Sequence, residues 1–154
     1  MKPRIYIDTS VVGGCIDEEF ASWSNLLFEG FRQGSRIAVV SDLTKRELAH
    51  APEEVQQVLM SVPSDHIESV LLTEEADDLA RRYIEDGAVS RRHVVDAQHI
   101  AIATIARVDV LVSWNFQQIV NLRHVRAYNS VNLKSGYPML EIRSPREVIH
   151  EEEV

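Results

Sequence analysis

Short apolar runs alternate along this chain with longer segments of helical periodicity. The apolar runs predict buried strands at 4–8, 37–40 and 110–113, with a further strand at 140–143. The segment 66–72 fits either a loop or an edge strand. Strands separated by helices predict a parallel sheet that is covered on both faces. We therefore predict an α/β fold with three layers, α/β/α, around a central, mainly parallel sheet of four to five strands.

The intervening segments predict helices, and punctuation residues mark several of their ends. In the first of them, apolar residues recur at Phe20, Trp23, Leu27 and Phe31, and Gly34 ends the pattern. Thr73 is a good cap for a later helix that opens with two glutamates, which suit the positive end of the helix dipole. The predicted helices are 18–33, 43–50, 52–60, 74–86, 93–107, 116–122 and 130–135.

The organisation of the chain is that of one domain. Its 154 residues contain no repeat and no Gly/Ser linker, so we expect a single domain over 1–154 that ends in an acidic, frayed tail at about 150–154. No stretch resembles a signal peptide or a membrane helix. The single cysteine, Cys15, excludes an internal disulfide and fits a reducing compartment. We expect a cytoplasmic protein.

The net charge of −8 argues against nonspecific binding to duplex nucleic acid, which requires a strongly basic surface. It leaves open a site for divalent cations or a partner that brings positive charge. Basic clusters such as Arg91-Arg92 are, taken alone, typical of solvated helix faces.

Polar side chains follow the predicted strands where parallel sheets bind ligands, beyond their carboxyl ends. Asp8 ends the first strand, Glu47 lies one turn into the helix after the second, and Asn115 follows the third. Asp96 lies early in the helix 93–107 and shares a helical face with His99 and two apolar residues. We expect this face to pack on the sheet and to bring Asp96 to the same edge.

Carboxylates that converge in this way repel one another, and a divalent cation would keep them ionised. Because the ligands are oxygen atoms, Mg²⁺ or Mn²⁺ is favoured over zinc. Simpler roles remain open: Asp8 as a turn or cap residue, Glu47 as a surface residue and His99 as a core histidine. Asp42 is best explained as a helix cap outside the site.

Four stretches together resemble a PIN domain, and more narrowly a VapC-like toxin of type II toxin–antitoxin systems. They are YIDTS, SDLTKRELAHAP, VVDAQHIAIATIA and VLVSWNF, in the family's order. The resemblance implies a ribonuclease that uses Mg²⁺ or Mn²⁺, with Asp8, Glu47 and Asp96 at the first three acidic positions. The fourth position, usually an aspartate, is Asn115, which contributes no charge and leaves a second metal site open.

The resemblance also implies roles and partners. Asp8 and Asp96 would be the principal metal ligands, and Glu47 either a ligand or the group that orients the attacking water. The supporting residues would be Ser10, His99, Ser113 and Asn115, and the RNA phosphates could contact Arg91 and Arg92. The expected partners are an RNA substrate, a cognate antitoxin protein and a second copy of the chain in a homodimer.

Two other functions start from the same residues. Asn115 favours a PIN-like module that binds RNA or protein without cleaving it. An aspartyl-phosphate phosphatase would also use a strand-terminal aspartate such as Asp8, but such enzymes carry a second aspartate where this chain has Ser10.

Overall fold

A computed structural model describes residues 1–153 of the chain. Its sheet has five parallel strands in the order β3-β2-β1-β4-β5. The strands are β1 (Arg4–Ile7), β2 (Ile37–Ser41), β3 (Ile67–Val70), β4 (Val110–Val112) and β5 (Ile142–Arg143). The predicted parallel sheet is confirmed, and the ambiguous segment 66–72 contains an edge strand.

Helices connect the strands and flank the sheet. The α-helices are α1 (Thr9–Gly14), α2 (Ala21–Gln33), α3 (Asp42–Ala49), α4 (Glu53–Met60), α5 (Glu74–Glu85), α6 (Val94–Ala106), α7 (Leu122–Lys134) and α8 (Pro145–Glu153). Two short 3-10 helices, η1 (Ser64–His66) and η2 (Arg91–His93), precede β3 and α6. None of the described helices is long and apolar enough to cross a membrane.

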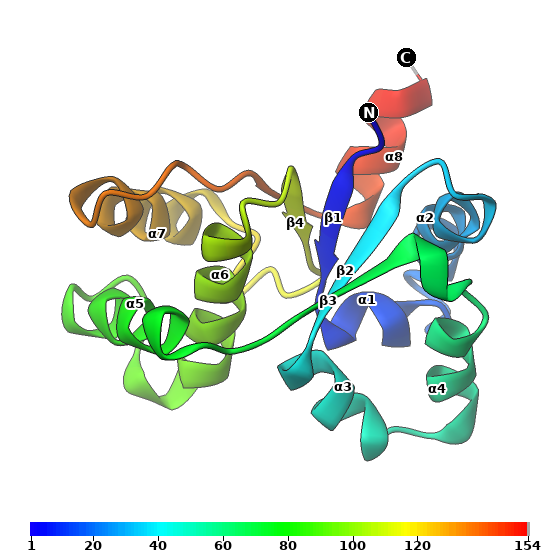
Figure 1. Ribbon diagram of the computed structural model, residues 1–154, viewed down its shortest axis with the longest axis horizontal. Helices are drawn as coiled ribbons and strands as arrows, with labels where there is room; N and C mark the ends of the chain where they lie inside the picture. Colours follow the sequence, from blue (N-terminus) through cyan, green and yellow to red (C-terminus); the bar gives the residue numbers. More distant parts are fainter. Residues whose placement is uncertain (154) are drawn as a thin grey trace.

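The helices form two layers, one on each face of the sheet, as Figure 1 shows. Helices α5, α6 and α7 pack over one face, where Tyr6, Val39 and Leu111 point from the central strands into a buried cluster. On the other face, Ile7 and Val112 point into a second cluster with α1, α2, α4 and α8. Successive strand residues thus alternate between two cores, and the predicted three-layer α/β/α architecture is confirmed.

Two predicted helices differ from the structure: residues 116–121 form turns and bends, and 130–135 falls almost wholly on the end of a longer helix. The chain was expected to form short helices at 116–122 and 130–135, but a single helix, α7, covers Leu122–Lys134. Its buried face carries Asn129 and Asn132, whose side chains bond to the carbonyl of Leu140 and to the hydroxyl of Thr104. Because these buried residues are polar, the apolar periodicity of α7 is interrupted in the sequence.

The segment before α2 also differs from the prediction. The helix expected over 18–33 begins only at Ala21, and α1 forms between β1 and α2. Two adjacent glycines at the end of α1, Gly13 and Gly14, weaken its helical signal. At the other end of the chain, α8 extends to Glu153, so the acidic tail expected at 150–154 falls on its last turn and on Val154, which lies outside the described residues.

Candidate active site

The strand order places the candidate site at a topological switch point. After β1 the chain adds β2 and β3 on one side of β1, and then returns to place β4 on its other side. Ile7 at the end of β1 pairs with Val112 at the end of β4, so the next residues, Asp8 and Ser113, lie side by side. Open parallel sheets bind ligands at such a point, in the crevice beyond the strand ends.

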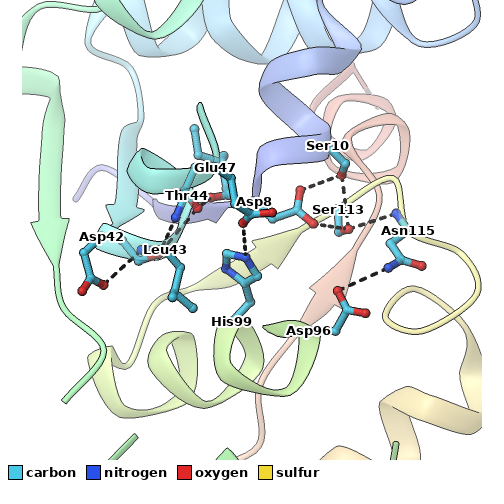
Figure 2. A network of polar contacts seen from close by, with 12 residues as sticks. Asp8, Ser10, Asp42, Leu43, Thr44, Glu47, Asp96, His99, Ser113 and Asn115 are labelled. Atoms are coloured by element: carbon cyan, nitrogen blue, oxygen red, sulfur yellow. Dashed lines mark hydrogen bonds and ion pairs between the residues drawn. The ribbon is translucent and has the colours of Figure 1, made fainter. Parts of the chain in front are cut away.

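Asp8 is almost completely buried, at 5% exposure, and both of its carboxylate oxygens are hydrogen-bonded. Oδ1 accepts hydrogen bonds from Ser10 Oγ at 2.6 Å and from the Val11 backbone N–H at 3.2 Å, and Oδ2 accepts from Ser113 Oγ at 2.5 Å. The bond from Val11 makes Asp8 the N-cap of α1. Asp8 therefore combines the simple role of a helix cap with a place at the ligand-binding edge (Figure 2).

Two serines hold this carboxylate and tie the loop after β4 to α1. Ser10 Oγ accepts the Trp114 backbone N–H at 2.9 Å, and Ser113 Oγ accepts the Asn115 backbone N–H at 2.9 Å. Because a carboxylate only accepts, each hydroxyl donates its hydrogen to Asp8 while its oxygen accepts the backbone N–H. The orientation of the Asp8 carboxylate is fixed by the backbone of a second, distant segment.

Asn115 presents its amide nitrogen, not its oxygen, to the site. Its Oδ1 accepts backbone N–H groups from Gln117 at 3.1 Å and Gln118 at 2.9 Å. Because only the amide oxygen can accept them, these two N–H groups show which atom of the Asn115 amide is the oxygen. The other atom, Nδ2, faces Asp96 Oδ1 at 3.5 Å. The carbonyl oxygen of Asn115 is therefore occupied by the backbone N–H groups of its own loop.

Asp96 lies in the first turn of α6 and is partly buried. Besides the Asn115 amide, it lies near His93, whose Nδ1 is 3.6 Å from Oδ2. Burial raises the pKa of Asp96, the nearby His99 and His93 oppose this, and the charges of Asp8 and Glu47 raise it further. The structure thus brings the three predicted acids close enough to repel one another.

Glu47 is positioned through a buried chain of polar groups. Its Oε1 lies 3.1 Å from Nε2 of His99, which is buried in the face of α6 that packs on the sheet. Because a carboxylate only accepts, Nε2 carries the hydrogen, and Nδ1 faces the Tyr6 hydroxyl at 2.6 Å. That hydroxyl also lies 2.8 Å from Ser41 Oγ at the end of β2. The bond from His99 lowers the pKa of Glu47, against the opposing effect of partial burial.

Burial raises the pKa of Asp8 as well, although His99 and the hydroxyl and N–H donors around the carboxylate favour its ionised form. Thr9, directly after Asp8, adds a buried hydroxyl that lowers the pKa of Glu47 and has no hydrogen-bond partner at ordinary distance in the described part of the chain. A buried hydroxyl beside Glu47 without a partner at ordinary distance is consistent with a site that accommodates an ion or its water.

The donor chemistry of this edge fits a hard divalent cation. Mutual repulsion of Asp8, Glu47 and Asp96 is the condition that such a cation relieves, and oxygen ligands suit Mg²⁺ or Mn²⁺. Across residues 1–150, however, no group of three His, Cys, Asp or Glu side chains is already gathered at the spacing of a formed metal centre. The carboxylates are held by hydroxyl and amide donors, which a cation would have to displace in part.

The remaining predicted residues lie near the site but outside this network. Arg91 and Arg92 belong to η2, immediately before α6, and both are exposed. Sequence reasoning missed Tyr6 and His93. Of these, His93 had a detectable signal, because it lies three residues before Asp96 and shares its helical face.

Comparisons with known proteins identify the fold. No protein-family model matches the sequence, and no curated protein matches it. Among solved structures, the chain is similar to a toxin–antitoxin complex from Klebsiella pneumoniae, with 13% identity over 78% of this chain and 93% of the other, and a TM-score of 0.56.

Two further solved structures extend the likeness over more of the chain. One is VapBC2 from Rickettsia felis bound to a DNA fragment from its promoter (15% identity, 92% and 98% coverage, TM-score 0.55). The other is VapC20 from Mycobacterium tuberculosis, a toxin that cleaves the sarcin–ricin loop (10% identity, 88% and 98% coverage, TM-score 0.57). The chain therefore has the PIN-like fold of VapC toxins, as the sequence predicted.

Proposed function

We propose that this protein is an endoribonuclease that depends on Mg²⁺ or Mn²⁺ and serves as the toxin of a toxin–antitoxin pair. The observation that carries the proposal is the convergence of Asp8, Glu47 and Asp96 at the switch point of a PIN-like sheet. The fold is shared with a toxin whose RNA substrate is named, the sarcin–ricin loop. That likeness supports the class of reaction and leaves the RNA target of this chain to be determined.

Asp8 and Asp96 are the proposed holders of the cation. A bound Mg²⁺ would supply an activated water and stabilise charge on the phosphate. The chain's own contribution is orientation: Ser10 and Ser113 fix the Asp8 carboxylate, and His99 fixes that of Glu47. Glu47 is half exposed, and its lowered pKa favours the ionised form, so it is suited to orient a bound water.

Cleavage of a fluorophore-labelled RNA by the purified protein tests this proposal. We expect cleavage with Mg²⁺ or Mn²⁺, none in excess chelator, and a loss of at least about 100-fold in Asp8→Asn and Asp96→Asn, a typical effect of removing a principal catalytic group. Asp86→Asn, which removes an exposed carboxylate paired with Lys134, should cleave like the wild type. Cleavage that persists in chelator or in both site variants would refute the proposal.

A non-cleaving module that binds RNA or protein is the second candidate, and the Asn115 amide favours it. The Nδ2 group directed at Asp96 provides a hydrogen-bond donor where a fourth acid would add a metal ligand. Calorimetric titration with Mn²⁺ separates the two candidates. If the protein is an enzyme, the wild type should bind Mn²⁺ and Asp8→Ala should not. If the protein is a binding module, the wild type should not bind Mn²⁺, and only the Asn115→Asp variant, in which the added carboxylate faces Asp96, should bind it.

The proposed partners follow the same reasoning. Solved structures of this fold include a toxin–antitoxin complex and VapBC2, so we propose an antitoxin that covers the acidic edge and a homodimer of the toxin. Co-expression with the product of an adjacent gene, followed by light scattering on the purified complex, tests both assemblies. A monomer that co-purifies with nothing would contradict them.

A further inference from the structure

Beside the acidic edge lies an open pocket of about 660 Å³ whose charged lining is entirely basic. Arginines and histidines line it from two directions, and no Asp or Glu is among the lining residues: Arg91, Arg92 and His93 of η2, with Arg123 and His124 of α7. The chain as a whole carries 24 aspartates and glutamates against 16 lysines and arginines. A pocket without an acid is therefore a local reversal of the charge of this protein.

The three arginines of this basic pocket are not engaged by the protein itself. Arg91, Arg92 and Arg123 form no ion pair or side-chain hydrogen bond with any described residue, and all three are exposed. Arg4 and Arg81, by contrast, have their guanidinium groups paired with carboxylates. Guanidinium groups without a partner keep their donors available for an anion, and their planar geometry matches phosphate oxygens.

The walls of the pocket are fixed by buried contacts. His124 Nδ1 lies 2.8 Å from the Ala88 carbonyl oxygen and so donates to it, which joins α7 to the loop after α5. Ala88 is itself buried, and its N–H bonds to the carbonyl of Tyr83 at 2.8 Å. The loop and the start of α7 are thereby held together, and the basic side chains share one concave surface without a ligand.

The basic pocket adjoins the carboxylates through shared residues. His93 lines the pocket and also lies 3.6 Å from Asp96. Gln118 lines the pocket as well, and its backbone N–H donates to Asn115 Oδ1 at 2.9 Å. An anion in the pocket is therefore a near neighbour of any group that reacts at the acidic edge.

We infer that the basic pocket binds a backbone phosphate of the RNA strand, next to the phosphate that is cleaved. That the anion is RNA rests on the proposed function, whereas the pocket's preference for a phosphate-like anion follows from its lining. An RNA strand approaching the acidic edge is repelled by Asp8, Glu47 and Asp96. Basic residues placed directly beside these acids offset that repulsion and fix the register of the strand.

Binding of a short fluorescent single-stranded RNA in chelator, followed by anisotropy, tests the pocket without requiring cleavage. We expect Arg123→Ala to weaken binding about five- to ten-fold, the loss of a charge-assisted contact. The slope of log K against log[salt] should also fall by about 0.7, as for one lost phosphate contact on a single strand. Arg126→Ala is the matched control, because Arg126 is exposed one turn further along α7 and does not line the pocket.

Arg92→Ala provides a second variant from the opposite wall, in case Arg123→Ala fails to fold. The inference would be overturned if both variants bound RNA as tightly as the wild type. It would also be overturned if an acidic peptide occupied the pocket and RNA binding did not change. The proposed function is judged separately. If RNA binding depends on these arginines but no Mg²⁺-dependent cleavage occurs, the inference about the basic pocket stands and the proposed ribonuclease activity is refuted. If the protein cleaves RNA but its RNA binding does not depend on the pocket, the proposed activity stands and the inference about the basic pocket is refuted.

Discussion

At the scale of single residues, Asp8 and Asp96 show how burial and ligand chemistry oppose each other. Both carboxylates have a raised pKa, chiefly because burial disfavours their charged form. Each ionised acid is thus a cost to the folded protein that a bound cation would relieve. Functional sites commonly retain such costs, and removing one should stabilise the chain while abolishing its activity.

Asp96→Asn should raise the thermal midpoint of the metal-free protein at pH 7.5 by about 2–4 °C. The folded pKa of Asp96 lies above its unfolded value, so wild-type stability rises as pH falls through that folded pKa. The variant has no such titration, and its advantage should therefore shrink towards acidic pH. Melting curves at pH 7.5 and at acidic pH check this, with Glu18→Gln as an exposed control. An equal or lower midpoint at pH 7.5 would contradict the assigned pKa direction.

The acids themselves could be predicted from the sequence, but the state of Asn115 could not. A polar residue close after a buried strand is visible in the sequence, as with Asp8 after β1 and Asn115 after β4. Which amide atom of Asn115 faces the site depends on the backbone N–H groups of Gln117 and Gln118. Their positions follow from the loop conformation, which the side-chain pattern does not encode.

At the scale of elements, α1 fixes the loop that carries Ser113 and Asn115. Gly14 at its end lies against the indole of Trp114 and the hydroxyl of Ser24, and these two side chains bond to each other at 2.8 Å. A Cβ at Gly14 would lie 2.6 Å from both Ser24 Oγ and Trp114 Nε1. The close approach of α1 to the loop after β4 therefore requires glycine here. The sequence shows the glycine pair without showing which member needs to be glycine.

The neighbouring glycines provide a matched test of this contact. Gly14→Ala should lower stability by about 1–3 kcal/mol through overpacking against Trp114. Gly13→Ala meets no heavy atom within 4 Å, and it should be neutral or stabilise by up to about 1 kcal/mol through helix propensity. Urea denaturation of the two variants compares them directly. Equal effects would show that α1 does not pack as described.

The chain of Tyr6, His99 and Glu47 connects β1, α6 and α3 across the core. The sequence identified His99 as either a core histidine or a supporting residue, and its contacts combine the two: it is buried and holds Glu47. Tyr6 could not be assigned this contact from the sequence, because its partner follows from the packing of α6 on the sheet.

Tyr6→Phe should destabilise the protein by about 1–3 kcal/mol, because buried Nδ1 of His99 loses its hydrogen-bond partner and Ser41 Oγ keeps only Thr44. It should also lower RNA cleavage, since Glu47 loses its orientation. Tyr137→Phe removes an exposed hydroxyl bonded to Glu75 and should change stability by less than about 0.5 kcal/mol. Thermal melts and cleavage rates of both variants test this. If Tyr6→Phe matches Tyr137→Phe in both measurements, Tyr6 does not position Glu47.

At the scale of the whole molecule, strand order brings the distant motifs together. The alternation of strands and helices was enough to predict a parallel three-layer fold and to place Asp8 and Asn115 at one edge. It could not give the order β3-β2-β1-β4-β5, which depends on pairings between residues far apart in the sequence. That order makes the ends of β1 and β4 neighbours, and it also brings η2 and α7 together around the basic pocket beside the acids.

The most direct test of the central claim is to map RNA ends. Cellular RNA is incubated with the wild type and with Asp96→Asn, each with Mg²⁺ and with chelator, and new termini are sequenced. We expect discrete new termini only with the wild type in Mg²⁺. Termini that also appear with Asp96→Asn, or in chelator, would contradict a metal-dependent ribonuclease at this edge of the sheet. Their absence from every reaction would favour the binding module.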